Sequence, residues 1–126
     1  MRVGQQKHAG PPVVLCIDDD SASLALRKLL LEMKGYAVVT VTTGARGIAL
    51  ARDIHCDVVV LDLEMPVTNG EQVAQILKEE HPELPIILLT GLTGDISKTL
   101  LARIDARVTK GSGDLALSIA SILQQR

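Results

Sequence analysis

The 126-residue chain has no Phe or Trp and a single Tyr, Tyr36. Hydrophobic residues still make up 47% of the sequence, so the core must be built from Leu, Ile, Val and Ala. Proteins that bind single-stranded nucleic acids stack the bases on aromatic side chains, which are missing here. The net charge of −2 also provides no basic surface for duplex DNA. The composition therefore disfavours nucleic-acid binding.

Several other features are scarce. The two cysteines, Cys16 and Cys56, lie in or beside apolar segments, and we predict both to be reduced, buried side chains. No apolar run is long enough to span a membrane, and residues 1–12 lack the apolar core of a signal peptide. We therefore expect a cytoplasmic protein with no membrane partner. A G-x-x-x-x-G-K-[ST] loop is also missing, which disfavours nucleotide binding.

The run from Val58 to Leu61 is continuously apolar and ends at Asp62. Four consecutive apolar residues predict a strand that is buried on both faces, as in a parallel sheet covered by helices on each side. In such sheets, ligands bind just outside the carboxyl ends of the strands, which is where Asp62 falls. Asp57 precedes the same apolar run. At 3.3 Å per residue it lies about 16 Å from Asp62, and we expect its side chain to be in solvent at that end of the strand.

Strand-like and helix-like segments alternate five times along the chain. After a flexible lead-in over residues 1–12, we predict one domain over 13–126 with strands at 13–17, 36–41, 58–62, 86–90 and 106–109. Strict alternation with crossover helices predicts a three-layer α/β fold, a (βα)5 doubly wound parallel sheet.

Helix boundaries and buried faces follow from capping residues and from apolar spacing. We predict caps at Thr43, Asn69, Asp95 and Ser112, with Gln72 completing a capping box and Gly35 and Pro82 ending the first and third helices. The first helix is expected to bury one apolar stripe. That stripe comprises Ala22, Ala25, Leu26, Leu29, Leu30 and Met33.

Polar residues that end the predicted strands should meet at one edge of the sheet. They are Asp18, Asp19, Asp62, Thr90 and Lys110. Three carboxylates in one pocket repel each other, and a divalent cation with oxygen ligands, most simply Mg²⁺, compensates them. An ammonium and a hydroxyl can bind phosphoryl oxygens, so the set matches phosphoryl transfer to an aspartate.

The chain resembles the receiver domain of bacterial two-component response regulators of the chemotaxis-regulator type. The resemblance extends from Val13 to the C-terminus. It rests on four segments in order at strand ends: Ile17-Asp18-Asp19-Asp20, Leu61-Asp62-Leu63-Glu64-Met65-Pro66 with Asn69-Gly70, Leu89-Thr90-Gly91 and Thr109-Lys110. It implies a flavodoxin-like fold with strand order 2-1-3-4-5. It also implies a signalling module rather than an enzyme in the ordinary sense.

The resemblance also implies roles for these residues. Asp62 accepts a phosphoryl group from a histidine kinase or phosphotransfer protein, which alters binding of a downstream protein partner. Asp18, Asp19, Asp62 and the backbone carbonyl of Glu64 hold Mg²⁺. Lys110 and Thr90 bind the phosphoryl oxygens. Glu64 and Leu92 correspond to positions that tune the phosphoryl lifetime.

Three departures from the receiver pattern fall on the output face that the resemblance implies. Arg107 replaces the usual aromatic residue three positions before the lysine, and we expect its side chain to point to solvent. Gly111 follows the lysine in place of proline, which removes a pre-set geometry. Thr90 and Lys110 are about two residues closer than is typical, which shortens the fourth helix or its loops.

Two alternatives stay open at this stage. The first is a receiver-like protein-interaction module that is not phosphorylated, which the altered output face favours. The second is a small phosphatase of the haloacid dehalogenase type, whose Asp-x-Asp motif Asp62-Leu63-Glu64 matches only loosely.

Overall fold

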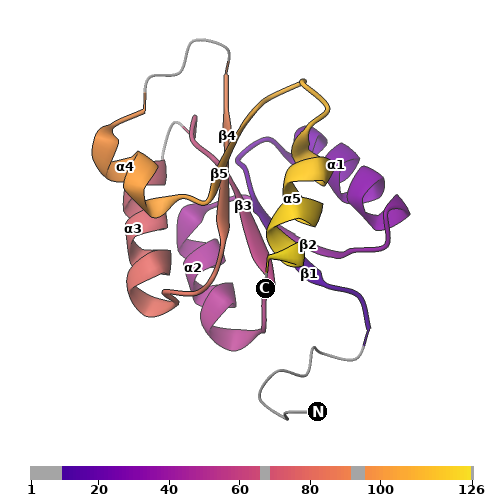
Figure 1. Ribbon diagram of the computed structural model, residues 1–126, viewed down its shortest axis with the longest axis horizontal. Helices are drawn as coiled ribbons and strands as arrows, with labels where there is room; N and C mark the ends of the chain where they lie inside the picture. The colour runs from indigo at the N-terminus through magenta and orange to yellow at the C-terminus, as the bar shows by residue number, and fades with distance from the viewer. Residues whose placement is uncertain (1–9, 66–68, 92–95, 126) are drawn as a thin grey trace.

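Five parallel strands form one sheet in the order β2-β1-β3-β4-β5, as Figure 1 shows in ribbon form. The computed structural model describes residues 10–65, 69–91 and 96–125. The elements are β1 Val13–Ile17, α1 Ser21–Met33, β2 Ala37–Val41, α2 Gly44–Asp53, β3 Val58–Asp62, α3 Gly70–Glu80, β4 Ile86–Thr90, α4 Lys98–Arg103, β5 Ala106–Thr109 and α5 Leu115–Gln124. The (βα)5 fold and the strand order implied by the resemblance are confirmed.

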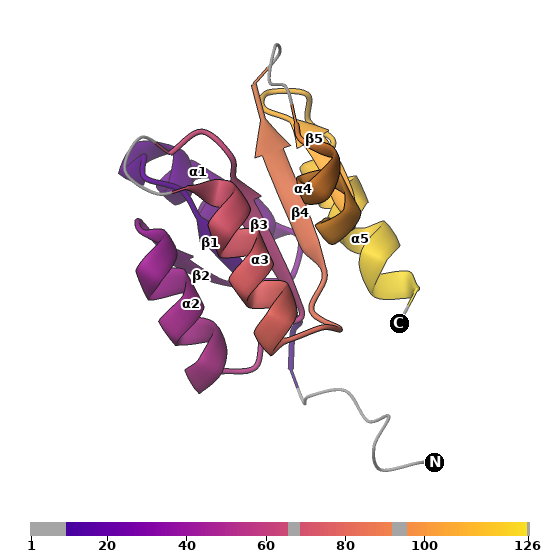
Figure 2. The same ribbon diagram turned by 90° about the vertical axis from the view of Figure 1, so that its left-hand side faces the viewer.

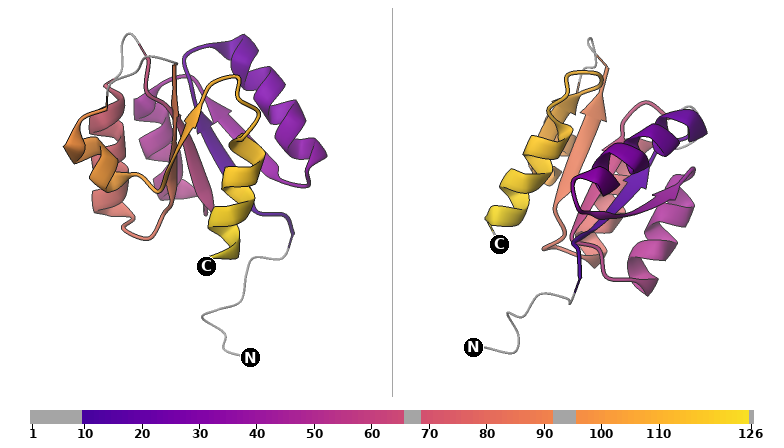
Figure 3. Two further views of the ribbon diagram at one scale, coloured as in Figure 1. Left: turned by 45° about the horizontal axis from the view of Figure 1, so that its top comes forward. Right: turned by 90° about the vertical axis from the view of Figure 1, so that its right-hand side faces the viewer.

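Helices cover both faces of the sheet, with α1 and α5 on one face and α2, α3 and α4 on the other (Figures 2 and 3). Alternate strand residues therefore enter different cores. Leu15, Ile17, Val59 and Leu61 pack on the side of α2 and α3. Val14, Cys16, Val58 and Val60 pack on the side of α1 and α5. The central strands are buried on both faces, as the apolar run in β3 predicts.

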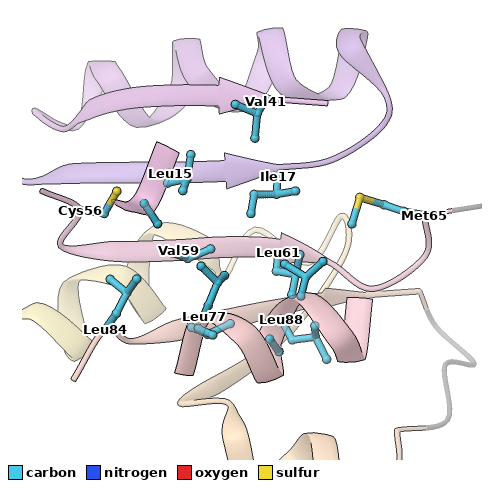
Figure 4. Close-up of a cluster of buried hydrophobic side chains, with 14 of the residues drawn as sticks. Leu15, Ile17, Val41, Cys56, Val59, Leu61, Met65, Leu77, Leu84 and Leu88 are labelled. Atoms are coloured by element: carbon cyan, nitrogen blue, oxygen red, sulfur yellow. The ribbon is translucent and has the colours of Figure 1, made fainter. Parts of the chain in front are cut away.

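The core beneath α2 and α3 is entirely aliphatic apart from its sulfur atoms (Figure 4). Leu77 of α3 lies against Val59 and Leu61 of β3 in this view, and Ile17 packs from β1. Gly47 lets α2 approach β1 closely, because a Cβ at this position would lie 2.3 Å from Ile17 Cδ1. This glycine thereby allows α2 to pack directly on β1, the strand that leads into Asp18.

The predicted buried face of α1 is wrong. Leu24 and Leu31 are the buried residues of this helix, and Arg27 and Lys28 lie between them on the same face. The predicted stripe faces solvent instead: Leu26, Leu29, Leu30 and Met33 are 52–74% exposed. Helix α1 has two faces with the same residue spacing. The more apolar face is exposed to solvent, because the basic side chains on the buried face have hydrogen-bond partners there.

Two of the four predicted caps, Thr43 and Asn69, are confirmed. Asp20, Thr43 and Asn69 each accept a backbone hydrogen bond at the start of a helix, and Gly35, with φ of 97°, follows the end of α1. Asp95 lies outside the described residues, and the cap of α4 is Ser97, which accepts from Leu100 N at 3.1 Å.

The predicted cap of the last helix, Ser112, is wrong, because α5 begins at Leu115 after Asp114. Ser112 Oγ instead accepts a hydrogen bond from Asp114 N at 3.3 Å, within the turn that precedes the helix. Within the described ranges, every helix is too short or too polar to cross a bilayer.

Asp57 is not in solvent, contrary to prediction. It is buried just before β3, and its Oδ2 accepts a hydrogen bond from Val13 N at 2.7 Å. Its Oδ1 lies 3.1 Å from His55 Nε2. The amide that opens β1 needs an acceptor, and the carboxylate supplies it. Asp57 therefore has a structural role at the amino edge of the sheet.

Candidate functional site

Four strands deliver polar residues to the carboxyl edge of the sheet, which is the upper edge in Figure 2 where the β4 arrow ends. Asp18 follows β1, Asp62 ends β3, Thr90 ends β4 and Lys110 follows β5. The register places Asp62 beside Leu89 and Thr90 beside Thr109. These residues are far apart in the sequence, and the parallel sheet brings them together.

Three carboxylates form the floor of the site. One oxygen from each of Asp18, Asp19 and Asp62 lies within 4.8 Å of the others. Asp18 and Asp62 are buried and Asp19 is exposed. Such a set suits a hard divalent cation, which takes oxygen ligands and keeps several waters. The predicted convergence of these three residues is therefore found in the structure.

Lys110 lies directly against this floor. Its Nζ is 2.8 Å from Asp62 Oδ1 and 3.4 Å from Glu64 Oε1. Partial burial opposes the charged ammonium, but its hydrogen bond to Asp62 and the Glu64 carboxylate outweigh that effect and raise the pKa of Lys110. The side chain is thus a permanent cation beside the Asp62 carboxyl.

Burial raises the pKa of the Asp62 carboxyl above its ordinary value, and the adjacent Asp18 carboxylate adds to the rise. Lys110 and the Glu64 amide, which donates to Asp62 Oδ1 at 3.0 Å, act in the opposite direction. The fold therefore holds Asp62 in a site where its charge is costly until further positive charge arrives. A divalent cation in the pocket would supply that charge.

Thr90 has an orphaned hydroxyl. The residue is fully buried, and its Oγ1 makes no hydrogen bond to any described part of the protein. Buried polar atoms are normally paired, so an unpaired hydroxyl at the end of β4 marks a place for a ligand oxygen. The residues present therefore fit a cation and an anionic oxygen group bound together.

Glu64 lies at the mouth of the site, with its side chain 51% exposed and in contact with Lys110. A Cβ at Gly91 would lie 2.9 Å from Glu64 Oε2, so the glycine after Thr90 leaves space for this carboxylate. Glu64 therefore lies beside Lys110 at the entrance to the site. Leu92, the other residue predicted to tune phosphoryl lifetime, and Pro66 lie outside the described residues.

One charged neighbour of the site was not predicted from the sequence. Arg27 Nη2 of α1 donates to Asp18 Oδ2 at 3.1 Å. Sequence reasoning assigned the helix face by hydrophobicity, which placed an arginine outside by default. The signal that could have identified it is its spacing from Leu24 and Leu31, which puts all three side chains on one helix face.

The three departures on the far side of β4 have structural counterparts. Arg107 is exposed on β5, as predicted. Gly111 has φ of 80°, a conformation that proline cannot adopt, and the described residues contain no cis peptide bond. Helix α4 has six residues, whereas each of the other helices has at least ten. The shorter spacing therefore does fall in this region.

Comparison with known proteins identifies the family. Residues 14–119 match the response regulator receiver domain, and the chain therefore belongs to this family of two-component signalling modules. The acidic pocket lies at the expected edge of the fold. Members of the family are signalling modules rather than conventional enzymes, so the phosphatase alternative is set aside.

The curated relatives are longer proteins. The chain is 30% identical over 100 residues to the autoinducer 1 sensor kinase/phosphatase LuxN of Vibrio campbellii, covering 79% of this chain and 12% of LuxN. It is 40% identical over 83 residues to the DNA-binding dual master transcriptional regulator RpaA of Synechocystis, covering 64% of this chain and 34% of RpaA. The chain thus spans about a third or less of these relatives.

Solved structures share the fold over nearly the whole chain. The response regulator TrrA of Thermotoga maritima, in complex with Mg²⁺ and BeF, superposes with a TM-score of 0.83 at 27% identity, covering 89% of this chain and 99% of TrrA. TrrA in complex with the histidine kinase ThkA gives a TM-score of 0.81 at 27% identity, covering 89% of this chain and 98% of TrrA.

Proposed function

We propose that this protein is a phosphoacceptor receiver of a two-component phosphorelay, with Asp62 as the Mg²⁺-dependent site of phosphorylation. The observation that carries the proposal is the placement of one buried carboxylate, Asp62, between two further carboxylates and the Lys110 ammonium. The Thr90 hydroxyl at the adjacent strand end, which has no hydrogen-bond partner among the described residues, supports the proposal. No other described strand end combines an acidic cluster with a paired lysine.

In this proposal, Asp19, Asp62 and the backbone carbonyl of Glu64 hold Mg²⁺, with Asp18 assisting. When bound, the ion neutralises negative charge on the transferring group. Lys110 binds one phosphoryl oxygen as a point charge, and Thr90 donates its hydroxyl to another. TrrA, which binds Mg²⁺ and BeF, supports this assignment by analogy.

The transfer step is a displacement at phosphorus. An Asp62 carboxylate oxygen forms the new O–P bond while the N–P bond of a phosphohistidine breaks, and the electron pair returns to the imidazole nitrogen. Hydrolysis of the acyl phosphate later restores the carboxylate. Lys110 must leave its 2.8 Å contact with Asp62 Oδ1, or share it, to reach a phosphoryl oxygen.

The partner in this step is a histidine kinase or a phosphotransfer protein. The solvent-exposed row of α1, formed by Leu26, Leu29, Leu30 and Met33, begins near the carboxyl edge and follows the spacing of helix-to-helix packing. Its four apolar side chains suit a helical partner. The kinase complex of TrrA supports such a partner by analogy.

We further propose that residues 13–126 form the receiver unit after a lead-in over 1–12, and that the protein is cytoplasmic. Its output is binding of a downstream protein partner, and the receiver itself contacts no nucleic acid. RpaA is described as DNA-binding, but only 34% of RpaA is matched by this chain.

Treatment with a small acyl-phosphate donor and Mg²⁺ tests the proposal. Intact mass spectrometry should show a gain of one phosphoryl group that disappears in Asp62→Ala and when Mg²⁺ is removed by a chelator. Asp57→Ala is the matched control, because this carboxylate lies just before β3, at the opposite edge of the sheet from Asp62. Its phosphoryl gain should be retained.

A receiver-like interaction module that is not phosphorylated is the second candidate. The exposed row of α1 favours it, since such a surface could bind a partner without any change at Asp62. Binding of the partner that is the same for the wild-type protein and for Asp62→Ala, with no phosphoryl gain in either, would support this candidate instead.

A further inference from the structure

Arg27 forms a shielded ion pair inside the site. Its guanidinium lies 3.1 Å from Asp18 Oδ2, and the side chains of Arg27 and Asp18 are only 13% and 3% exposed. A pair at this depth is weakly screened by salt, so its electrostatic influence extends to the neighbouring carboxylates. Arg27 is therefore part of the charge balance of the pocket although it comes from a helix rather than from a strand end.

Both oxygens of Asp18 are occupied. Oδ1 accepts a hydrogen bond from Asp20 N at 2.9 Å, and Oδ2 accepts from Arg27. With Glu64, which also pairs with Lys110, four carboxylates face the two cations Lys110 and Arg27, which leaves two excess negative charges. Removing the charge of Arg27 adds one further negative charge to the pocket, which favours binding of a divalent cation.

We propose that Arg27 is a resident counter-ion that competes with Mg²⁺ for the carboxylate pocket and thereby sets its metal affinity. The inference rests on the proposed function, since it concerns the same metal site. Mg²⁺ beside Asp18 is repelled by the guanidinium, and any movement of Asp18 toward the ion weakens the pair. Arg27 acts through Asp18 and is a positioning residue, not a catalytic one.

The structure leaves room for the guanidinium to respond. Arg27 lines a hollow of about 110 Å³ beneath the connection between β5 and α5, and its Nη1 is buried without a hydrogen-bond partner among the described residues. The backbone around this hollow includes two glycines with positive φ, Gly111 and Gly113. The guanidinium therefore has space to shift when Asp18 turns to a cation. The Arg27–Asp18 pair thus lowers the metal affinity of the pocket without preventing metal binding.

Titration with MgCl₂, followed by amide chemical shifts in NMR, tests the inference on the full chain. Arg27→Gln keeps a hydrogen-bond donor but removes the charge, and it should bind Mg²⁺ about tenfold more tightly than wild type. Arg27→Lys keeps the charge and should bind about as wild type does. Arg52→Met is the matched control: its pair with Glu80 joins α2 to α3 away from the pocket, so Mg²⁺ affinity should not change.

Thermal unfolding gives a second readout. Arg27→Gln should melt below wild type in metal-free buffer, because the carboxylates then repel each other more strongly, and Mg²⁺ should raise its melting temperature by more than it raises that of wild type. If Arg27→Gln is unfolded without metal, Mg²⁺ should restore its folded spectrum. An unfolded state that persists at saturating Mg²⁺ would overturn the inference.

The remaining outcomes separate the two proposals. Unchanged or weaker Mg²⁺ binding in folded Arg27→Gln overturns the counter-ion role. Mg²⁺ binding in Arg27→Lys that is as tight as in Arg27→Gln also overturns it. In both cases the proposed function stands. If Mg²⁺ causes no chemical-shift changes in wild type, or if the changes persist in Asp19→Asn, the metal-dependent function fails and the inference fails with it.

Discussion

Lys110 Nζ lies 2.8 Å from Asp62 Oδ1, and this contact joins the last strand to the central strand at the carboxyl edge. The lysine contacts the carboxylate that we propose as nucleophile, so the two groups neutralise each other in this structure. A phosphoryl group must replace one carboxylate contact of Lys110 with a phosphoryl oxygen. The free-energy cost of a negative charge on Asp62 is therefore the quantity that the first prediction tests.

The first prediction concerns stability and pH. Burial raises the pKa of Asp62 in the folded state above the unfolded value near 3.8, so the folded protein holds a proton that the unfolded chain has lost. Stability in metal-free buffer therefore falls as pH rises from the unfolded value through the folded one. Asp62→Asn removes this loss and should raise the melting temperature at pH 7 by about 2–5 °C.

Calorimetry with and without Mg²⁺ checks this expectation. The gain should shrink when Mg²⁺ is added, because only the carboxylate binds the ion. Asp114→Asn, at an exposed position without a side-chain cap bond, is the control and should change the melting temperature little. A lower melting temperature for Asp62→Asn at pH 7 in metal-free buffer would contradict the electrostatic account.

The second prediction separates the two aspartates of β3 and its entry. Asp57→Ala leaves the Val13 amide without its 2.7 Å acceptor, which should cost about 1–3 kcal/mol in urea unfolding. Asp57→Asn, which keeps an acceptor oxygen, should cost less. Both variants should take up a phosphoryl group as wild type does, and loss of uptake in a folded variant would show that the amino edge is coupled to the site.

The third prediction tests the corrected face of α1. Leu24→Ala and Leu31→Ala should each lower the free energy of unfolding by about 2–4 kcal/mol, because both side chains are buried. Leu26→Ala and Leu29→Ala remove exposed side chains and should stay within about 0.5 kcal/mol of wild type. Chemical denaturation measures all four, and the reverse ranking would restore the face inferred from hydrophobicity.

The fourth prediction concerns the thiols. Burial raises the pKa of Cys16 to about 12 and that of Cys56 to about 11. Since the thiolate is the reactive form, both cysteines should resist a disulfide reagent at pH 8 in the native protein and react fully in urea. Labelling of either thiol in the native state at the rate of a free cysteine would contradict the burial of that side chain.

The fold and most of the candidate site could be predicted because they depend on features that are local in sequence. A buried parallel strand reads as an apolar run, and the polar residue after it falls at a shared edge, which brings Asp62, Thr90 and Lys110 to one place. Asp57 was misjudged because the need of the Val13 amide for an acceptor arises only when β1 and β3 pair.

The inner face of α1 could not be predicted from hydrophobicity. Arg27 and Lys28 occupy it because each finds a buried partner from another element: Asp18 for the guanidinium, and the Val38 carbonyl at 3.1 Å for the ammonium. Such partners are tertiary, and no local pattern announces them. The aliphatic stems of both residues pack on the inner face while Arg27 Nη2 and Lys28 Nζ donate to these partners. The exposed row of α1 therefore remains open to solvent and to partners.

The central claim is that Asp62 is the residue that carries the phosphoryl group. After treatment with an acyl-phosphate donor and Mg²⁺, borohydride reduction converts a phosphorylated aspartate to homoserine, which peptide mass spectrometry locates. We predict homoserine at position 62 alone, and none when Mg²⁺ is withheld. Homoserine at Asp18, Asp19 or Asp57 with residue 62 unmodified would contradict the account.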